Sequence, residues 1–157
     1  MERSLAIVLL LALGCMHSAC HKETDEDKVR KVVSAMQTAT EEKKVMAVQE
    51  HISRSYRDPQ GNDFEAIKGL FNFYFFRHRT VGVFIPSLEV SVNGPSATAK
   101  FHAVLTAKGI DGESASLLLP DALGAYNFDV SFRQEEGAWK IVSAKWERAL
   151  AGGGQQQ

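Results

Sequence analysis

The pair of residues best suited to acid–base chemistry is a histidine and an aspartate on neighbouring predicted strands. His102 and Asp129 stand in segments where apolar and polar residues alternate, and a histidine oriented by a carboxylate can act as a general base. They share their faces with Lys100 and Asn127, which is typical of a solvated sheet surface carrying cross-strand pairs. We therefore interpret the pair as structural. Catalysis by His102, Asp129 and Tyr74 is the alternative.

A second histidine, His78, directly follows a predicted apolar helix that ends near Arg77. A positive side chain at that place complements the negative end of the helix dipole. We interpret His78 as such a charge complement or as a residue at the mouth of a cavity, in preference to a catalytic base.

Clusters that resemble metal sites are weak in this sequence. His17, Cys20 and His21 have a spacing that could chelate a borderline metal, but three ligands in a tether make a poor site. The acidic residues around Gly61 lack the alternating spacing of a calcium loop, and a turn followed by a helix cap explains them. Phosphate-loop, nucleophile-elbow and dinucleotide motifs are missing from the sequence, and we predict no metal and no cofactor.

The two cysteines lie at the beginning of the chain, around an apolar segment. Arg3 precedes the apolar run from Leu5 to Leu13, and then come Gly14 and Cys15, in the order of a signal peptide. The run is too short to span a bilayer, which takes roughly 20 apolar residues. Residues 11–15 resemble the bacterial lipoprotein signal, in which a small residue precedes a cysteine that is acylated before the leader is removed.

That resemblance implies a lipid anchor of the palmitate type on Cys15. Cys20 is the alternative anchor, and an ordinary signal cleaved after Ala19 is a third reading. Met16 stands where the lipoprotein sorting rule would have an aspartate to retain the protein at the inner membrane, so the resemblance implies an outer-membrane position facing the periplasm. At most one free thiol remains, and we expect no intrachain disulfide.

Composition and pattern indicate one α+β domain. The chain has 157 residues and a net charge of −1, which argues against a nucleic-acid partner. Thr24 is the expected cap of a first helix, and a second helix is expected to begin near Thr38 or Thr40. A third runs from Asp63 to about Arg77, with Asn62 or Asp63 as its cap. The third helix is apolar on most of its circumference, so we expect it to lie against a sheet with little of it in water.

After the helices the apolar residues alternate with a period of two, which predicts antiparallel strands. Pro86 should force a bend, an edge or a break in the first strand, and Asn93-Gly94 predicts a hairpin turn. In the last strand the alternation places Trp139 and Ile141 on the face opposite Ala144 and Trp146.

The segment 109–124 is rich in glycine, serine and leucine. We predict that it forms a further short strand. The alternatives are a lip over the cavity or part of a homodimer interface, since concentrated apolar stretches often mark contacts.

This order of elements, with the turn at residues 56–61 and the closing Gly137-Ala138-Trp139-Lys140-Ile141 strand, resembles the nuclear transport factor 2-like superfamily. The resemblance implies a cystatin-like cone, in which helices and a curved antiparallel sheet enclose a cavity. The chain then divides into a leader (1–14), a tether (15–23), the domain (24–148) and a flexible tail (149–157). The residues expected to line the cavity are Phe71, Tyr74, Phe75, Phe101, Tyr126, Phe128 and Trp139.

The predicted interior is almost wholly apolar, and the acid–base set of an isomerase is missing from it. Whether the protein is an enzyme stays open. We favour a lipid-anchored envelope protein that binds an apolar small molecule or a protein partner through the cavity or the sheet face. The alternatives are an isomerase- or dehydratase-like enzyme and a structural protein of the envelope, and a homodimer through the sheet fits each of these roles.

Overall fold

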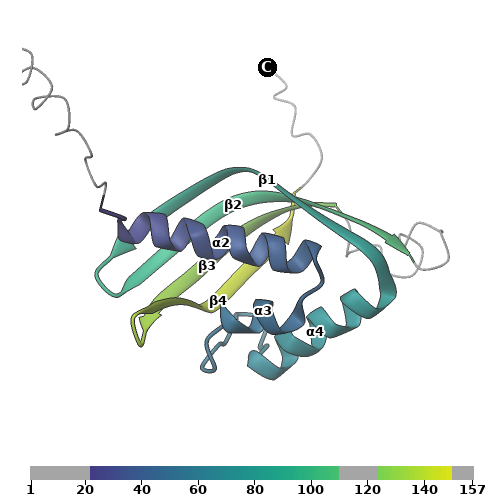
Figure 1. Cartoon of the computed structure of the whole chain (residues 1–157), viewed down its shortest axis with the longest axis horizontal. Coiled ribbons are helices and arrows are strands. Elements are labelled where there is room, and N and C mark those ends of the chain that lie inside the picture. The colour runs from purple at the N-terminus through teal and green to yellow at the C-terminus, as the bar shows by residue number, and fades with distance from the viewer. Residues whose placement is uncertain (1–21, 110–123, 150–157) are drawn as a thin grey trace, which may run out of the picture.

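A computed structural model describes residues 22–109 and 124–149. Three helices precede four strands in this part of the chain: α2 (Asp25–Glu41), α3 (Val45–Glu50), α4 (Phe64–Arg77), β1 (His78–Asn93), β2 (Ser96–Gly109), β3 (Gly124–Glu135) and β4 (Ala138–Arg148). The strands pair antiparallel in the order β1-β2-β3-β4, and the sheet arches over the helices (Figure 1). The predicted α+β class is confirmed. The leader, both candidate anchor cysteines and the predicted strand within 110–123 lie outside the described residues.

The two longer helices begin at side-chain caps. The Thr24 hydroxyl accepts a hydrogen bond from the Asp27 backbone N–H (3.1 Å), and the Asp27 carboxylate accepts one from the Thr24 N–H (3.0 Å). The Asp63 carboxylate accepts from the Ala66 N–H at the start of α4 (2.9 Å). Each cap satisfies backbone donors that the first helical turn leaves without a partner. Both predicted starts are confirmed.

The predicted start of the second helix near Thr38 or Thr40 is wrong, because α2 continues through both residues to Glu41. The Thr40 hydroxyl donates to the Met36 carbonyl one turn earlier (2.7 Å) and so stays within the helix. The chain leaves α2 at Lys43, whose φ is +55°, and α3 begins two residues later.

A bulge accommodates Pro86 in the edge strand β1. The pairing with β2 passes from Phe84 opposite Val104 to Ser87 opposite His102, so β1 has one extra residue. A bulge on an edge strand tolerates the missing N–H of proline. The expected bend at Pro86 is thus present, and β1 remains one continuous strand through it.

A second bulge, in β4, changes which side chains face inward. Ser131 pairs with Ser143, but the next residue, Phe132, pairs with Ile141, which leaves Val142 as the extra residue. Side chains beyond the bulge therefore exchange faces, and Trp146 lies on the inner side together with Ile141. The predicted separation of Ala144 and Trp146 from Ile141 onto opposite faces is wrong.

Other parts of the chain form hydrogen bonds to backbone groups at both edges of the sheet. At β1, side chains of α2 bind the outward-facing backbone: Gln37 Nε2 donates to the Val83 carbonyl (2.8 Å), and Glu41 accepts from the Val83 N–H (3.0 Å). At β4, the Ile141 N–H donates to the His51 carbonyl, and the Ser53 N–H donates to the Ile141 carbonyl, both at 2.9 Å. These contacts satisfy edge groups that would otherwise be open to pairing with another chain.

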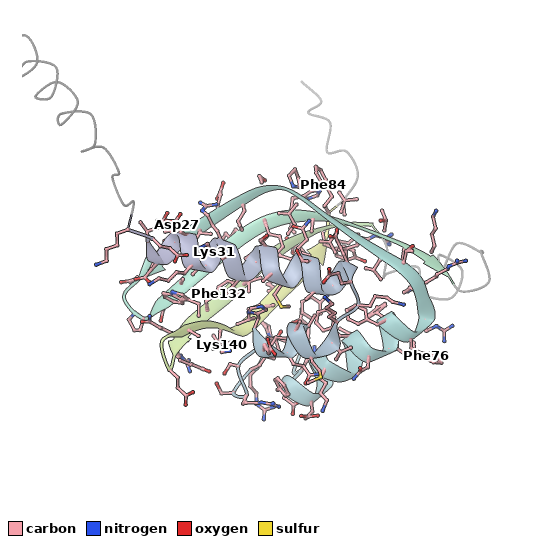
Figure 2. All side chains as sticks on the ribbon, in the orientation of Figure 1. Asp27, Lys31, Phe76, Phe84, Phe132 and Lys140 are labelled. Carbon is pink, nitrogen blue, oxygen red and sulfur yellow. The ribbon has the colours of Figure 1, made fainter. Side chains whose placement is uncertain are left out.

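α4 is less covered than its composition predicted. Ile67 and Phe75 are buried, whereas Phe73 is 45% and Phe76 81% exposed, and Figure 2 places Phe76 on the outer side of the helix. α2 lies along the inner face of the sheet (Figure 1), so α4 can bury only one of its apolar sides. The expectation that little of this helix meets water is wrong. None of the helices in the described residues is long and apolar enough to cross a membrane.

Candidate functional site

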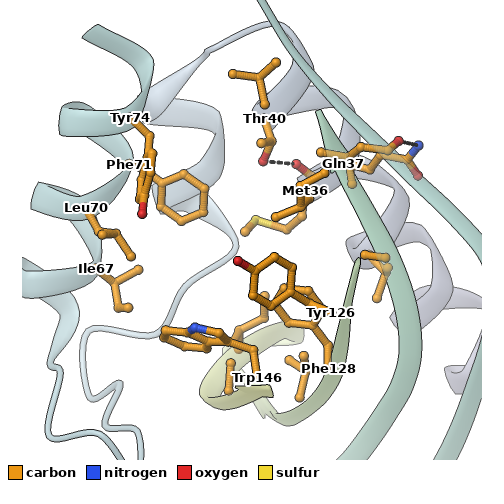
Figure 3. A pocket seen from close by; sticks show the side chains of 18 of the residues that line it. Met36, Gln37, Thr40, Ile67, Leu70, Phe71, Tyr74, Tyr126, Phe128 and Trp146 are labelled. Carbon is orange, nitrogen blue, oxygen red and sulfur yellow. Dashed lines mark hydrogen bonds between the residues drawn. The ribbon is translucent and has the colours of Figure 1, made fainter. Parts of the chain in front are cut away.

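A cavity of about 310 Å³ lies between the inner face of the sheet and helices α2 and α4. This volume is at the lower end of the range typical of small-molecule sites, about 300–1,000 Å³. Figure 3 shows Met36 of α2, Phe71 of α4 and Tyr126 of β3 converging on it. Among the described residues that form its wall there is no aspartate, glutamate, lysine or arginine.

Six of the seven residues expected to line the cavity are in its wall: Phe71, Tyr74, Phe75, Phe101, Tyr126 and Phe128. The Phe101 and Phe128 rings stack at 5.1 Å across β2 and β3. The seventh, Trp139, is 3% exposed and belongs to the hydrophobic core, and Trp146 takes a place in the cavity wall instead. The bulge at Val142 turns Trp146 inward, whereas Trp139 lies before the bulge and stays buried in the core.

Polar groups reach the cavity from three sides. Tyr126 extends from the sheet toward Met36 (Figure 3) and is 7% exposed. Gln37 and Thr40 line the wall from α2, and Tyr74 lines it from α4. The wall is therefore apolar with a few uncharged polar side chains, a composition common to ligand pockets.

His78 also lies in this wall. It is 3% exposed, and neither Nδ1 nor Nε2 has a hydrogen-bond partner in the part of the chain that the structure describes. Its burial, followed by the positive charges of Arg77 and Lys43, lowers the pKa of the imidazole below 6.5. A buried ring with a lowered pKa is not a charge complement for the helix, so that reading of His78 is wrong. The other reading, a residue at the mouth of a cavity, placed His78 beside the cavity whose wall it lines.

The lowered pKa of His78 predicts a pH-dependent stability. Below about pH 6.5 the unfolded chain takes up a proton on this histidine more readily than the folded chain. The free energy of unfolding should therefore fall as the pH drops from 7 to 5, and His78→Phe should reduce that slope in urea titrations. His51, whose pKa is also lowered by burial, should supply part of what remains. His102→Phe, which replaces a histidine on the outer face of the sheet, is the control. If the unfolding free energy of His78→Phe depended on pH as steeply as that of the unaltered protein, this assignment would be contradicted.

His102 and Asp129 lie on the outer face of the sheet, away from the cavity. Lys100 Nζ is 3.6 Å from the Asp129 carboxylate, and His102 Nδ1 is 3.2 Å from the Asn127 side-chain oxygen. Each residue thus has a different cross-strand partner. Opposite charges alternate across all four strands at this level, in the order Glu89, Lys100, Asp129, Lys145. This geometry supports the interpretation of the two residues as members of polar pairs that stabilise the strand register.

The carboxylate of Asp58, a residue of the predicted turn, comes close to the cavity wall through Tyr56, a contact that the sequence did not indicate. The Tyr56 ring lines the cavity, and its hydroxyl donates to Asp58 Oδ2 (3.1 Å). Asp58 also accepts from the Gln60 N–H, the Asn62 N–H and the Asn62 side-chain amide, each at 2.9 Å. Burial opposes its ionisation, but these hydrogen bonds outweigh burial and lower the pKa of Asp58. All its bonds hold the turn and Tyr56, so its role here is structural.

The acidic residues around this turn have structural partners, as the interpretation of a turn and a helix cap predicted. Asp58 binds the turn, Asp63 caps α4, and Glu65 lies 3.0 Å from Lys68. Within residues 22–109 and 124–149, no three His, Cys, Asp or Glu side chains gather as metal ligands would. The His17, Cys20 and His21 cluster lies outside these ranges.

Comparison with known proteins identifies the fold. No family model matches the chain, and no curated protein matches it in sequence. Among solved structures, a nuclear transport factor 2-like superfamily protein from Salmonella enterica is 13% identical, with a TM-score of 0.67 over 84% of this chain and 96% of that one. A proposed aromatic ring hydroxylase from Novosphingobium aromaticivorans is 14% identical, with a TM-score of 0.68 over 80% of this chain and 90% of the other.

A proposed dehydratase of the nuclear transport factor 2-like family from Streptomyces avermitilis is also similar. It is 14% identical, with a TM-score of 0.65 over 82% of this chain and 98% of that one. Identities this low show the fold alone. The chain has the α+β nuclear transport factor 2-like fold, with helices packed on a four-stranded antiparallel sheet.

Proposed function

We propose that this nuclear transport factor 2-like domain binds an uncharged, largely apolar small molecule in its cavity. The observation that carries the proposal is the wall of a cavity of about 310 Å³, whose described residues include no charged side chain. An apolar ligand gains about 25 cal/mol for each Å² of surface it buries. A charged ligand would lose its hydration without gaining an ion pair in that wall.

The side chains of the cavity wall are better suited to binding a ligand than to acid–base catalysis. A carboxylate that acts as a base must face the reacting group. Asp58 contacts the cavity wall only through the Tyr56 hydroxyl, and its oxygens already accept four hydrogen bonds. His102 and Asp129 lie on the outer face of the sheet and do not line the cavity. These observations support a binding role over the isomerase- or dehydratase-like alternative.

Two fluorescent probes with the same ring system test the proposal. N-phenyl-1-naphthylamine is neutral, and 8-anilino-1-naphthalenesulfonate adds a sulfonate to the same skeleton. We expect the neutral probe to bind saturably with one site per chain and to quench Trp146, which lines the cavity. The anionic probe should bind at least about tenfold more weakly. Equal affinities, or no saturable binding of the neutral probe, would contradict the proposal.

We further propose that an acyl chain on Cys15 tethers the domain to a membrane, at the outer membrane facing the periplasm. The order of apolar run, glycine and cysteine in residues 5–15 supports this. Acyl chains bind the bilayer with about 0.8 kcal/mol per buried methylene, so the domain itself needs no membrane-binding surface.

Replacing Cys15 with serine in the full chain should abolish labelling by an alkyne analogue of palmitate and move the protein from the membrane to the soluble fraction. The matched control is Cys20→Ser, which should label and sediment like the unaltered chain. Labelling that is lost in Cys20→Ser and kept in Cys15→Ser would assign the anchor to Cys20. Labelling that persists in both single variants would contradict a single acylated cysteine.

A further inference from the structure

His78 is a polar residue of the cavity wall that makes no side-chain hydrogen bond to the part of the chain that the structure describes. Its side chain is 3% exposed and lines the cavity, and both ring nitrogens lack a partner among the described residues. A buried polar group without a hydrogen bond destabilises the folded protein. A bound molecule that hydrogen-bonds to the ring would account for a buried histidine that has no partner within the described protein.

The surroundings of His78 hold its ring in place. Tyr74, one turn earlier on α4, stacks on the imidazole with the ring centres 6.1 Å apart and the planes 15° from parallel. Lys43 Nζ, from the turn after α2, donates to the carbonyls of His78 (2.7 Å) and Phe75 (3.1 Å). Because these contacts engage the ring face and the backbone, they orient the imidazole without using its nitrogens.

The charges around His78 restrict what it can bind. Arg77 and Lys43, the two cations that act on it, disfavour both a protonated imidazole and a cationic ligand. A neutral imidazole has one N–H donor and one nitrogen acceptor. A ligand hydroxyl can likewise donate or accept, so it can pair with whichever ring nitrogen faces the cavity. A carboxylate can only accept, and it would bring its charge into a wall without charged side chains.

We propose that His78 anchors the hydroxyl group of an otherwise apolar ligand, so that the ligand class is alcohols or phenols. The inference rests on the proposed function, because it names the polar group by which the cavity distinguishes its ligands.

Calorimetric titration of the full chain with naphthalene and 2-naphthol at pH 7.5 tests the inference, since the two probes differ by one hydroxyl. We expect the unaltered protein to bind 2-naphthol about tenfold more tightly, the effect of one hydrogen bond to a buried partner. In His78→Phe the two affinities should become equal. The matched control, His102→Phe on the outer face, should keep the preference.

The outcomes separate this inference from the proposed function. If 2-naphthol keeps its advantage in His78→Phe, or if the unaltered protein shows no preference, the anchoring role is overturned and the cavity remains a binding site. If neither probe binds the unaltered protein, both proposals fail. Should His78→Phe not fold, the imidazole ¹⁵N shifts of His78 in the unaltered protein decide: 2-naphthol should move them and naphthalene should not, and shifts that 2-naphthol leaves unmoved overturn the inference.

Discussion

Replacing Asp58 with alanine is expected to lower the free energy of unfolding by about 3 kcal/mol. The substitution removes the acceptor of four hydrogen bonds in the turn before α4. It also leaves the hydroxyl of Tyr56, a side chain that is 2% exposed, buried without its partner, and each such loss costs about 1–3 kcal/mol. Urea unfolding followed by circular dichroism measures the change.

Two further variants control for this effect. Tyr56→Phe together with Asp58→Ala should be less destabilising than the sum of the single variants, because it removes the unpaired hydroxyl as well. Asp129→Ala, which removes an exposed ion pair to Lys100, should change the stability by no more than about 0.5 kcal/mol. If Asp58→Ala were as mild as Asp129→Ala, the turn would not depend on the carboxylate.

Replacing Ala103 with phenylalanine is expected to weaken binding of the neutral probe by about a hundredfold. Ala103 is 1% exposed and lines the cavity from β2, so a benzyl group at this position would occupy the space that the ligand needs. Even a partial clash of this kind costs about 1–3 kcal/mol of free energy. A loss of about 2.8 kcal/mol in binding free energy corresponds to a hundredfold weaker affinity. Titration with N-phenyl-1-naphthylamine gives the ratio.

The matched control places the same side chain on the other face of the same strand. Thr98 is exposed on the outer face of β2, and Thr98→Phe should bind the probe like the unaltered protein. Thermal unfolding of both variants checks that they fold. Unchanged affinity in a folded Ala103→Phe would show that the probe binds elsewhere.

Features determined by local chemistry could be predicted from the sequence. The caps at Thr24 and Asp63 depend on side chains within three residues of the helix start. A hairpin follows Asn93 as predicted, but its turn residues are Gly94 and Pro95, one residue later than the predicted Asn93-Gly94, because Asn93 still pairs with Ser96. Gly94 has the φ of +57° that this turn requires. Period-two alternation also assigned His102 and Asp129 to a face away from the apolar stripe. For these features local spacing determines the outcome.

Features determined by strand register could not be predicted. The bulge at Val142 turns Trp146 inward, and nothing in the local pattern of apolar residues marks the extra residue. A register shift between His78 and Thr80 likewise removes His78 from the alternation of β1, so the alternating pattern could not show that His78 is buried in the cavity wall. Asp58 was interpreted as part of a turn, but its bond to the buried Tyr56 depends on how that turn packs.

Locating a bound probe in the cavity by NMR tests the central claim most directly. With N-phenyl-1-naphthylamine bound, the account predicts intermolecular nuclear Overhauser effects to the methyl groups of Met36, Ile67 and Ala103, all in the cavity wall. It predicts none to the methyl group of Thr98 on the outer face. Effects confined to exposed apolar side chains such as Met46, which is 79% exposed, would contradict the claim that the cavity is the binding site.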